Sequence, residues 1–274
     1  MIHTGSNPPN NPKIKAVAII PARYDSVRLP GKALLEIGGK PMICLVAERA
    51  RAALNVSSVI VATDDERIRE VVNKAGFEAV ITRPDHASGT DRIAEVAEKL
   101  GDAAIIVNVQ GDEPTIAPET IDRAVETLAR DTECGISTTW EPTESAADVL
   151  SPDVVKIVVD ENDRAVYFSR SPVPYPRDAV RQHGSLQQAL ENDSSLVARF
   201  RKHTGLYVYR REVLLAMARW PQSELEVIES LEQLRALEHG VKIKAIKAST
   251  ASIGVDTFED LERVRTMFRV QASA

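Results

Sequence analysis

The chain has 274 residues, enough to bury a sizeable core as one large domain or as a domain with a smaller lobe. Lys and Arg total 34 against 40 Asp and Glu, and the net charge of −6 argues against general attraction to nucleic acid or to an anionic membrane. No apolar run approaches the roughly 20 residues of a membrane span, and the N-terminus lacks the apolar segment of a signal peptide. Cys44 and Cys134 lie outside any metal-ligand spacing, so we expect two reduced thiols in a cytoplasmic protein.

The first half of the chain alternates between strand-like and helix-like patterns. Residues 1–12 are expected to form a disordered tail, and residues 13–274 a single domain. Short Val- and Ile-rich runs predict strands at 16–20, 58–62, 77–81 and 104–109, with helical periodicity between them. This alternation predicts an α/β fold, in which helices cover both faces of a mostly parallel sheet. The ligand site is expected at the carboxyl edge of that sheet.

The middle of the chain, about 154–209, has a different pattern. Strand-like VVKIVVD, RAVYFSR and GLYVYR occur here, with a proline-rich segment and the polar stretch Asp178 to Leu196 between the last two. We expect a smaller β-rich insertion that carries a mobile loop. Beyond it we expect helices at 211–217, at 227–239 with Gly240 as the C′ residue, and at 257–268, with a strand at 241–248.

The segment Ala16 to Lys32 indicates an anionic ligand. Its strand leads into a loop that carries Arg23, Arg28 and Lys32, and cations at the carboxyl end of a strand suit a group such as a triphosphate. The P-loop pattern is absent because Ser26 stands where glycine is required and Ala33 follows Lys32; the GxGxxG fingerprint is absent too. A solvated basic loop is the alternative interpretation of this segment.

Two carboxylates are candidate magnesium ligands. Asp112 follows the strand 104–109 within Gln110-Gly111-Asp112-Glu113-Pro114, a sequence that also suits an ordinary surface turn. The spacing of Asp256 to Glu259 also fits a helix N-cap with a capping box. Because Mg²⁺ takes one or two protein carboxylates together with phosphate oxygens, Asp112 and Asp256 suffice if they converge.

Two further groups of polar residues suggest binding sites. In SGTDR, Ser88 or Thr90 is expected to cap a helix. The N-terminus of this helix can hold an anion within reach of Arg92. The alternative is an amphipathic helix on which Arg92 is solvated. Later residues suit a hydroxyl-rich ligand that carries a carboxylate, although each alone also has a structural interpretation. This second group comprises Arg170, His203, Tyr207, Tyr209, Glu232 and Gln233.

Several motifs together resemble those of the 3-deoxy-manno-octulosonate (Kdo) cytidylyltransferase family, also called CMP-Kdo synthetases. The resemblance runs from about Lys15 to Phe268. LPGK and QGDEP are shared with other sugar nucleotidyltransferases, whereas YFSR, HxGxYxY and LEQLR together are more specific. Asp25, Val27 and the stretch Asp178 to Arg201 depart from the family pattern. The motifs are IPARYDSVRLPGK, SGTDR, VNVQGDEP, VVKIVV, YFSRSPVPY, HTGLYVY, ESLEQLR and GVDTFEDLE.

The resemblance implies a nucleotidyltransferase fold, a homodimer and a Mg²⁺-dependent reaction of CTP with Kdo that gives CMP-Kdo and pyrophosphate for lipopolysaccharide synthesis. The insertion would take part in sugar binding and dimerisation. A nucleotidyltransferase for another sugar acid, such as a sialic acid or an amino-substituted Kdo, is one alternative, and a non-catalytic nucleotide-sensing protein is another. The implied residues are Arg23, Lys32 and Asp112 for catalysis; Arg23, Ser26, Lys32, Ser88 and Gln110 for the nucleotide; Arg92, Arg170, His203, Tyr207, Glu232 and Gln233 for the sugar; and Asp112 and Asp256 for the metal.

Overall fold

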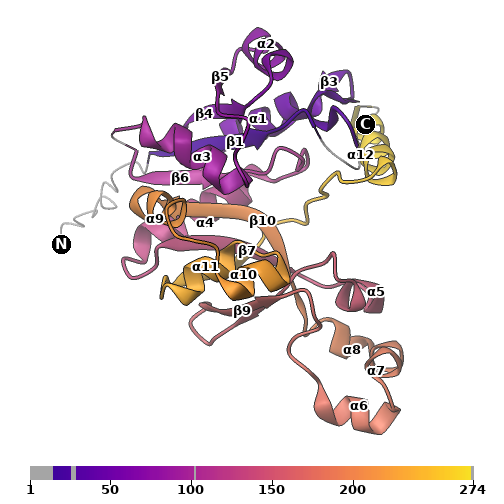
Figure 1. Ribbon diagram of the computed structural model, residues 1–274. Helices are drawn as coiled ribbons and strands as arrows, with labels where there is room; N and C mark the ends of the chain where they lie inside the picture. Colours follow the sequence, from indigo (N-terminus) through magenta and orange to yellow (C-terminus); the bar gives the residue numbers. More distant parts are fainter. Residues whose placement is uncertain (1–14, 26–28, 102, 273–274) are drawn as a thin grey trace, which may run out of the picture.

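One large sheet organises the part of the chain that the computed structural model describes, which is residues 15–25, 29–101 and 103–272. Within these residues the sheet has nine strands in the order β11-β7-β10-β6-β1-β4-β5, with β8 paired to β10 and β9 paired to β8 (Figure 1). The strands are β1 (Ala16–Ala22), β4 (Val56–Thr63), β5 (Glu78–Ile81), β6 (Ile105–Asn108), β7 (Ile136–Pro142), β8 (Lys156–Val159), β9 (Ala165–Ser169), β10 (Arg201–Arg210) and β11 (Ile243–Lys247). The expected tail and the tip of the first loop, including Ser26, Val27 and Arg28, lie outside the described residues.

The pairing is parallel where the chain alternates between strands and helices. β1 pairs in parallel with β4 and β6, and β4 pairs in parallel with β5. β10 then lies antiparallel between β6 and β7, and β11 returns parallel to β7. The mixed, mostly parallel α/β sheet predicted from the sequence is thereby confirmed.

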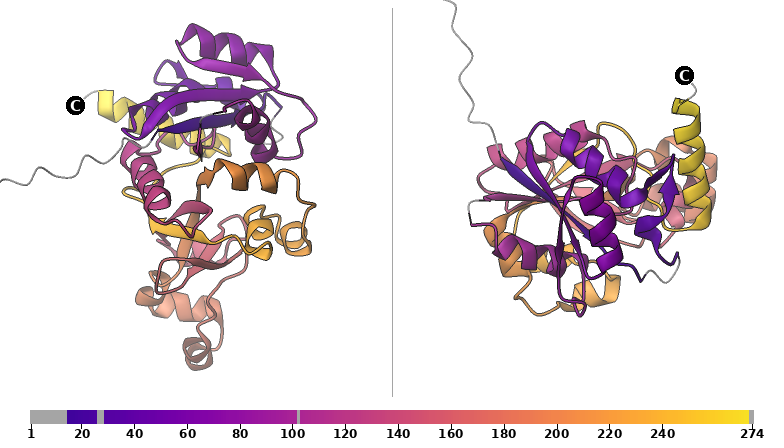
Figure 2. Two further views of the ribbon diagram at one scale, coloured as in Figure 1. Left: turned by 90° about the vertical axis from the view of Figure 1, so that its left-hand side faces the viewer. Right: turned by 90° about the horizontal axis from the view of Figure 1, so that it is seen from above.

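Helices cover both faces of the sheet because alternate residues of each strand point to opposite sides. On β1, Ala16, Ala18 and Ile20 face a core shared with α1 (Met42–Ala52), α2 (Glu66–Lys74) and α4 (Pro118–Arg130). Val17 and Ile19 face the opposite core, shared with α3 (Gly89–Glu98), α9 (Arg211–Met217) and α11 (Gln233–Glu238). Figure 2 shows the sheet between these layers of helices.

Four short helices project away from the sheet, at the lower right of Figure 1. They are α5 (Ala146–Leu150), α6 (Arg177–His183), α7 (Leu186–Asn192) and α8 (Ser194–Val197). The stretch predicted as a loop instead contains helices, because Ser185 and Asp193 cap α7 and α8 through side-chain hydrogen bonds. The few apolar residues of the stretch share a small core with Val149 and Phe200, whose positions cannot be read from local sequence.

The helix predicted for 227–239 is two helices. α10 (Glu224–Glu229) begins with a capping box between Ser223 and Glu226 and ends at Ser230, whose φ of 51° is left-handed. α11 starts three residues later, and Gly240 follows it with a φ of 74°, as expected for a C′ residue. The break is important because it directs the start of α11 toward the carboxyl edge of the sheet.

The last helix, α12 (Phe258–Ala272), packs over a small hairpin formed by β2 (Glu36–Ile37) and β3 (Lys40–Pro41). Arg265 Nε donates a hydrogen bond to the Glu36 carbonyl oxygen at 2.8 Å. Docking of α12 brings the segment before it, which includes Asp256, back to the first loop of the chain. Within the described residues, no helix combines the length and the apolar character needed to cross a membrane.

Candidate active site

Lys32 joins two carboxylates that are far apart in the sequence. It starts a short 3₁₀ turn (Lys32–Leu34) after β1, and its Nζ donates to Asp112 Oδ2 at 2.7 Å and to Asp256 Oδ1 at 3.1 Å. These three residues, with Arg23 and Gln110, line a cavity of about 410 Å³. The carboxylates therefore converge, which was the condition for a shared metal site.

The loop after β6 can approach β1 closely because residue 111 is glycine. A Cβ at Gly111 would lie 2.8 Å from the backbone oxygen of Pro21, closer than real Cβ contacts. On the other side of this loop, Val255 N donates to the Asp112 carbonyl oxygen at 2.8 Å. These contacts place Asp112 between the first loop and the segment that leads into α12.

Asp256 does not cap α12, which corrects the N-cap interpretation of the sequence. The capping contact is made by Thr257, whose Oγ1 accepts from Asp260 N at 3.2 Å. Asp260 Oδ2 in return accepts from Thr257 N at 2.9 Å and from Asp256 N at 3.2 Å. The carboxylate of Asp256 instead accepts the hydrogen bond from Lys32.

The charges of this cavity suit an anionic ligand that is held by the Lys32 ammonium or by a metal ion. Partial burial lowers the pKa of Lys32, but the carboxylates of Asp112 and Asp256 more than offset it, so the pKa is raised overall and the ammonium stays charged. The described residues contain no group of three or more His, Cys, Asp or Glu arranged to hold a metal ion. Two convergent carboxylates nevertheless fit Mg²⁺, which fills its remaining positions with water and phosphate oxygens.

A second cavity, of about 390 Å³, adjoins the first through Gln110, which lines both. Gln110 packs against β10 where residue 205 is glycine: its Nε2 donates to the Gly205 carbonyl oxygen at 3.3 Å, and a Cβ there would lie 2.8 Å from Gln110 Cγ. The cavity is rich in hydroxyl, amide and carboxylate groups. Its polar lining residues include Thr90, Asn108, Arg170, His203, Tyr207, Tyr209, Glu232 and Gln233.

Burial strongly shifts the ionisable groups of the second cavity. It lowers the pKa of His203 to about 3 and raises the pKa of Tyr207 well above its ordinary value, so both are neutral at physiological pH. Burial also raises the pKa of Glu232, and hydrogen bonding from Thr90 and Ser88 limits that rise. The guanidinium of Arg170 donates from Nε to the Glu229 carbonyl oxygen at 2.6 Å and from Nη1 to the Pro152 carbonyl oxygen at 2.9 Å. The cavity therefore combines neutral hydrogen-bonding groups with the Glu232 carboxyl and the anchored guanidinium of Arg170.

Arg92 does not line the second cavity, although the resemblance implies a sugar-binding role for it. The side chain is fully buried, and its Nη2 donates to Asp64 Oδ2 at 2.6 Å and its Nη1 to Thr82 Oγ1 at 2.5 Å. Arg92 thus joins α3 to the ends of β4 and β5. The guanidinium therefore points into the protein, toward Asp64 and Thr82.

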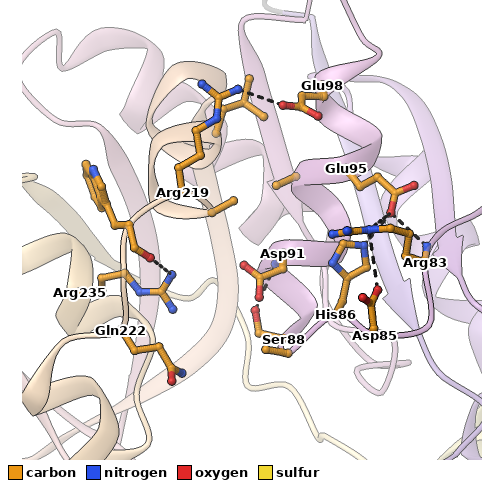
Figure 3. A pocket seen from close by; sticks show the side chains of 15 residues that line it. Arg83, Asp85, His86, Ser88, Asp91, Glu95, Glu98, Arg219, Gln222 and Arg235 are labelled. Carbon is orange, nitrogen blue, oxygen red and sulfur yellow. Dashed lines mark hydrogen bonds and ion pairs between the residues drawn. The ribbon is translucent and has the colours of Figure 1, made fainter.

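Ser88 does not line the cavity that holds Lys32. It caps α3 by accepting from Asp91 N at 3.1 Å, and it lines a third cavity of about 660 Å³ between α3 and the α9–α10 region (Figure 3). Two pairs of polar side chains line that cavity: His86 Nε2 lies 2.6 Å from Glu95 Oε2, and Arg219 pairs with Glu98 at 3.0 Å. The predicted catalytic residues do not line this cavity.

Sequence reasoning did not assign three polar groups to the second cavity or to the layer beneath it. Asn108 and Thr90 line it, and the fully buried Thr138 on β7 hydrogen-bonds to His203 at 2.8 Å. β7 was not among the predicted strands, so no pattern pointed to Thr138. Thr90 and Asn108 belong to motifs that were recognised, and their positions next to the predicted residues were the available signal.

The doubly covered, mostly parallel sheet and the lysine–carboxylate cavity at its carboxyl edge define a nucleotidyltransferase-like α/β protein. Residues 17–243 match the family model described as cytidylyltransferase. Together with relatives about 50% identical, this match shows that the chain belongs to the 3-deoxy-manno-octulosonate cytidylyltransferase family, as the motifs predicted.

The similarity to individual relatives extends over nearly the whole chain. A 3-deoxy-manno-octulosonate cytidylyltransferase from Geobacter metallireducens is 50% identical over 92% of this chain and 96% of its own length. One from Trichlorobacter lovleyi is 48% identical over 92% of this chain and 98% of its own.

Solved structures also resemble this chain over most of its length. A CMP:2-keto-3-deoxy-manno-octonic acid synthetase complexed with CTP is 44% identical and aligns with a TM-score of 0.83 over 94% of this chain and 99% of that one. A 4-diphosphocytidyl-2C-methyl-D-erythritol synthase from Anaerococcus prevotii, at 13% identity and a TM-score of 0.58 over 93% and 96% of the two chains, shares the fold alone.

Proposed function

We propose that the protein transfers CMP from CTP to the anomeric hydroxyl of Kdo and releases pyrophosphate, supplying CMP-Kdo for lipopolysaccharide synthesis. The observation that carries this proposal is the pair of adjoining cavities. One holds Lys32 between two carboxylates, the other is lined by hydroxyls and amides, and Gln110 belongs to both. Relatives about 50% identical over nearly their full length carry the name of this activity.

The first cavity is proposed to bind the triphosphate of CTP. Arg23 and Lys32 supply positive charge at the carboxyl end of β1, where phosphate groups bind in α/β proteins. Asp112 and Asp256 would hold Mg²⁺. When bound, this ion offsets negative charge on the phosphates. Lys32 donates to both carboxylates, and phosphate oxygens would replace them as its partners where Mg²⁺ binds Asp112 and Asp256.

The second cavity is proposed to orient Kdo. Tyr207, His203 and Gln233 can hydrogen-bond its hydroxyls, and Arg170 supplies the positive charge that its carboxylate requires. The anomeric oxygen attacks the α-phosphorus in line, so that the new O–P bond forms as the bond to the β-phosphate oxygen breaks and pyrophosphate leaves. The proton of the attacking hydroxyl passes to solvent. Positioning and charge stabilisation provide most of the acceleration, as is typical of phosphoryl transfer.

We also propose a cytoplasmic homodimer. Both cysteines are buried and unpaired, and burial raises the pKa of Cys134 to about 11, which suits inert, reduced thiols. An exposed apolar surface on α10 supports self-association. It is formed by Leu225, Val227 and Ile228.

The proposal is tested by pyrophosphate release from CTP, UTP, GTP and ATP, each with and without Kdo and with Mg²⁺ present or removed by a chelator. We expect release only with CTP, Kdo and Mg²⁺ together. A panel of other sugar acids tests substrate identity. Release with another nucleotide but not CTP would overturn the nucleotide assignment, and CTP binding without any release would indicate a nucleotide-sensing protein.

A further inference from the structure

Thr138 lies beneath the sugar cavity, at a break in the pairing of two central strands. β7 and β10 pair Thr138 with Tyr207 and Trp140 with His203, and the register shifts between these two pairs. Thr138 is completely buried. Because the register shifts here, the Thr138 hydroxyl contacts two β10 residues, His203 at the edge of the shift and Leu206 within it.

The hydrogen bonds of Thr138 decide the tautomer of His203. Thr138 Oγ1 donates to the Leu206 carbonyl oxygen at 2.7 Å and lies 2.8 Å from His203 Nε2. A hydroxyl has a single hydrogen, and a carbonyl oxygen can only accept. With that hydrogen committed to Leu206, His203 Nε2 must carry a proton and donate it to Thr138. The neutral ring therefore has its lone pair on Nδ1.

The Nδ1 atom is available to a ligand in the sugar cavity. His203 lines this cavity, and in the described part of the chain Nδ1 has no hydrogen-bond partner and is not among the fully buried unpaired atoms. Phe168 meets the ring edge-on with centroids 5.0 Å apart, and Tyr207 packs against it at 5.2 Å. Burial keeps the pKa of His203 at about 3, so the ring does not gain a second proton near neutral pH.

We propose that Thr138 is a positioning residue that fixes His203 as a hydrogen-bond acceptor, so that His203 selects a sugar hydroxyl and not the sugar carboxylate. This inference rests on the proposed function in one respect, that the sugar acid binds in this cavity. The direction of the hydrogen bond follows from Thr138 and Leu206 alone. A ligand group that can only accept, such as a carboxylate or a fluorine, would face the Nδ1 lone pair unfavourably.

The first test needs no substrate. Nitrogen-15 NMR of the full-length, histidine-labelled protein, with His203→Gln used to assign the signal among five histidines, should show a protonated Nε2 and an unprotonated Nδ1. This pattern should not change between about pH 5 and 8 if the ring stays neutral. Thr138→Ser keeps the hydroxyl and should preserve the tautomer, whereas Thr138→Val should not. A proton on Nδ1 in the wild type would overturn the inference.

The second test uses Kdo analogues in which each hydroxyl in turn is replaced by hydrogen or by fluorine. At one position both replacements should weaken binding roughly 10-fold, because neither can donate to Nδ1. His203→Ala should remove that loss, and Thr138→Val should raise KM for Kdo without raising KM for CTP, with rescue by Thr138→Ser. Equal binding of every fluoro analogue would refute the acceptor role. Failure of the wild type to use Kdo at all would instead refute the proposed function and leave the tautomer measurement standing.

Discussion

Replacing Lys32 by Met separates the catalytic role proposed for this lysine from its contribution to stability. The substitution keeps the length of the side chain but removes the ammonium that contacts Asp112 and Asp256 at 2.7 and 3.1 Å. The side chains of Lys32, Asp112 and Asp256 are 17%, 31% and 48% exposed, respectively, so solvent screens both ion pairs. Partly exposed pairs contribute about 0–1 kcal/mol each, and we expect the free energy of unfolding to change by no more than about 1–2 kcal/mol.

Turnover should respond far more strongly. In the proposed reaction the ammonium offsets charge on the triphosphate as pyrophosphate leaves, and removing one such electrostatic contact typically lowers kcat about 100- to 1000-fold. The assay is pyrophosphate release at saturating CTP, Kdo and Mg²⁺, together with urea denaturation of the same samples. Lys32→Arg, which keeps the charge but changes its geometry, should retain part of the activity.

The chain offers a matched control. Lys40 on β3 also pairs with a carboxylate, since its Nζ donates to both oxygens of Glu48 at 2.8 and 2.9 Å, but it lies outside the cavity and is 54% exposed. Lys40→Met should cost a similar small amount of stability and leave turnover unchanged. Near-normal turnover in Lys32→Met, or an equal loss in Lys40→Met, would refute the reasoning.

Three further predictions follow from the same structure. Asp112→Asn should lower turnover by orders of magnitude and weaken the dependence on Mg²⁺ while the circular dichroism spectrum is retained; unchanged turnover at saturating Mg²⁺ would exclude Asp112 as a ligand. Burial, with Asp112 and Glu141 nearby, raises the pKa of Glu113 from 4.5 to about 7, so the native state keeps a proton that the unfolded chain releases between these pH values. The free energy of unfolding should therefore fall as the pH rises through this window, and Glu113→Gln should show a smaller fall in denaturation curves measured across it. Ile228, 70% exposed on α10, should lie in the proposed dimer interface, so that Ile228→Glu yields monomers in sedimentation equilibrium and a dimer that persists would place the interface elsewhere.

Local sequence predicted those elements whose pattern is repeated within a short window. The Val- and Ile-rich runs at 16–20, 58–62 and 104–109 became β1, β4 and β6, because buried parallel strands are apolar on both faces. The helices of the projecting lobe escaped prediction, since their apolar faces pack on Val149 and Phe200 from other parts of the chain. Likewise the single helix expected at 227–239 is interrupted by Ser230, whose left-handed backbone no propensity indicates.

The candidate site residues likewise include some whose position the sequence indicated and some whose position it did not. Motif position was enough to bring Lys32, Asp112, Gln110 and Asp256 forward as candidates, and all four line one cavity. Arg92 had equally suggestive neighbours in SGTDR, yet its guanidinium is buried against Asp64 and Thr82. A short motif states which side chains are present near a helix start, but the direction of a long side chain depends on what packs around it.

By itself the sequence determined the alternation of strands and helices, the glycine that lets the Asp112 loop reach β1, and the residue types suited to phosphate, metal and sugar. Tertiary structure alone decided that carboxylates 80 and 224 residues from Lys32 would share its ammonium. It alone also decided that Thr138 would determine which ring nitrogen of His203 carries the proton. The physical reason is that backbone preference and hydrophobic period act over a few residues, whereas distances between charges and the direction of a buried hydrogen bond arise only when separate strands pack into one sheet.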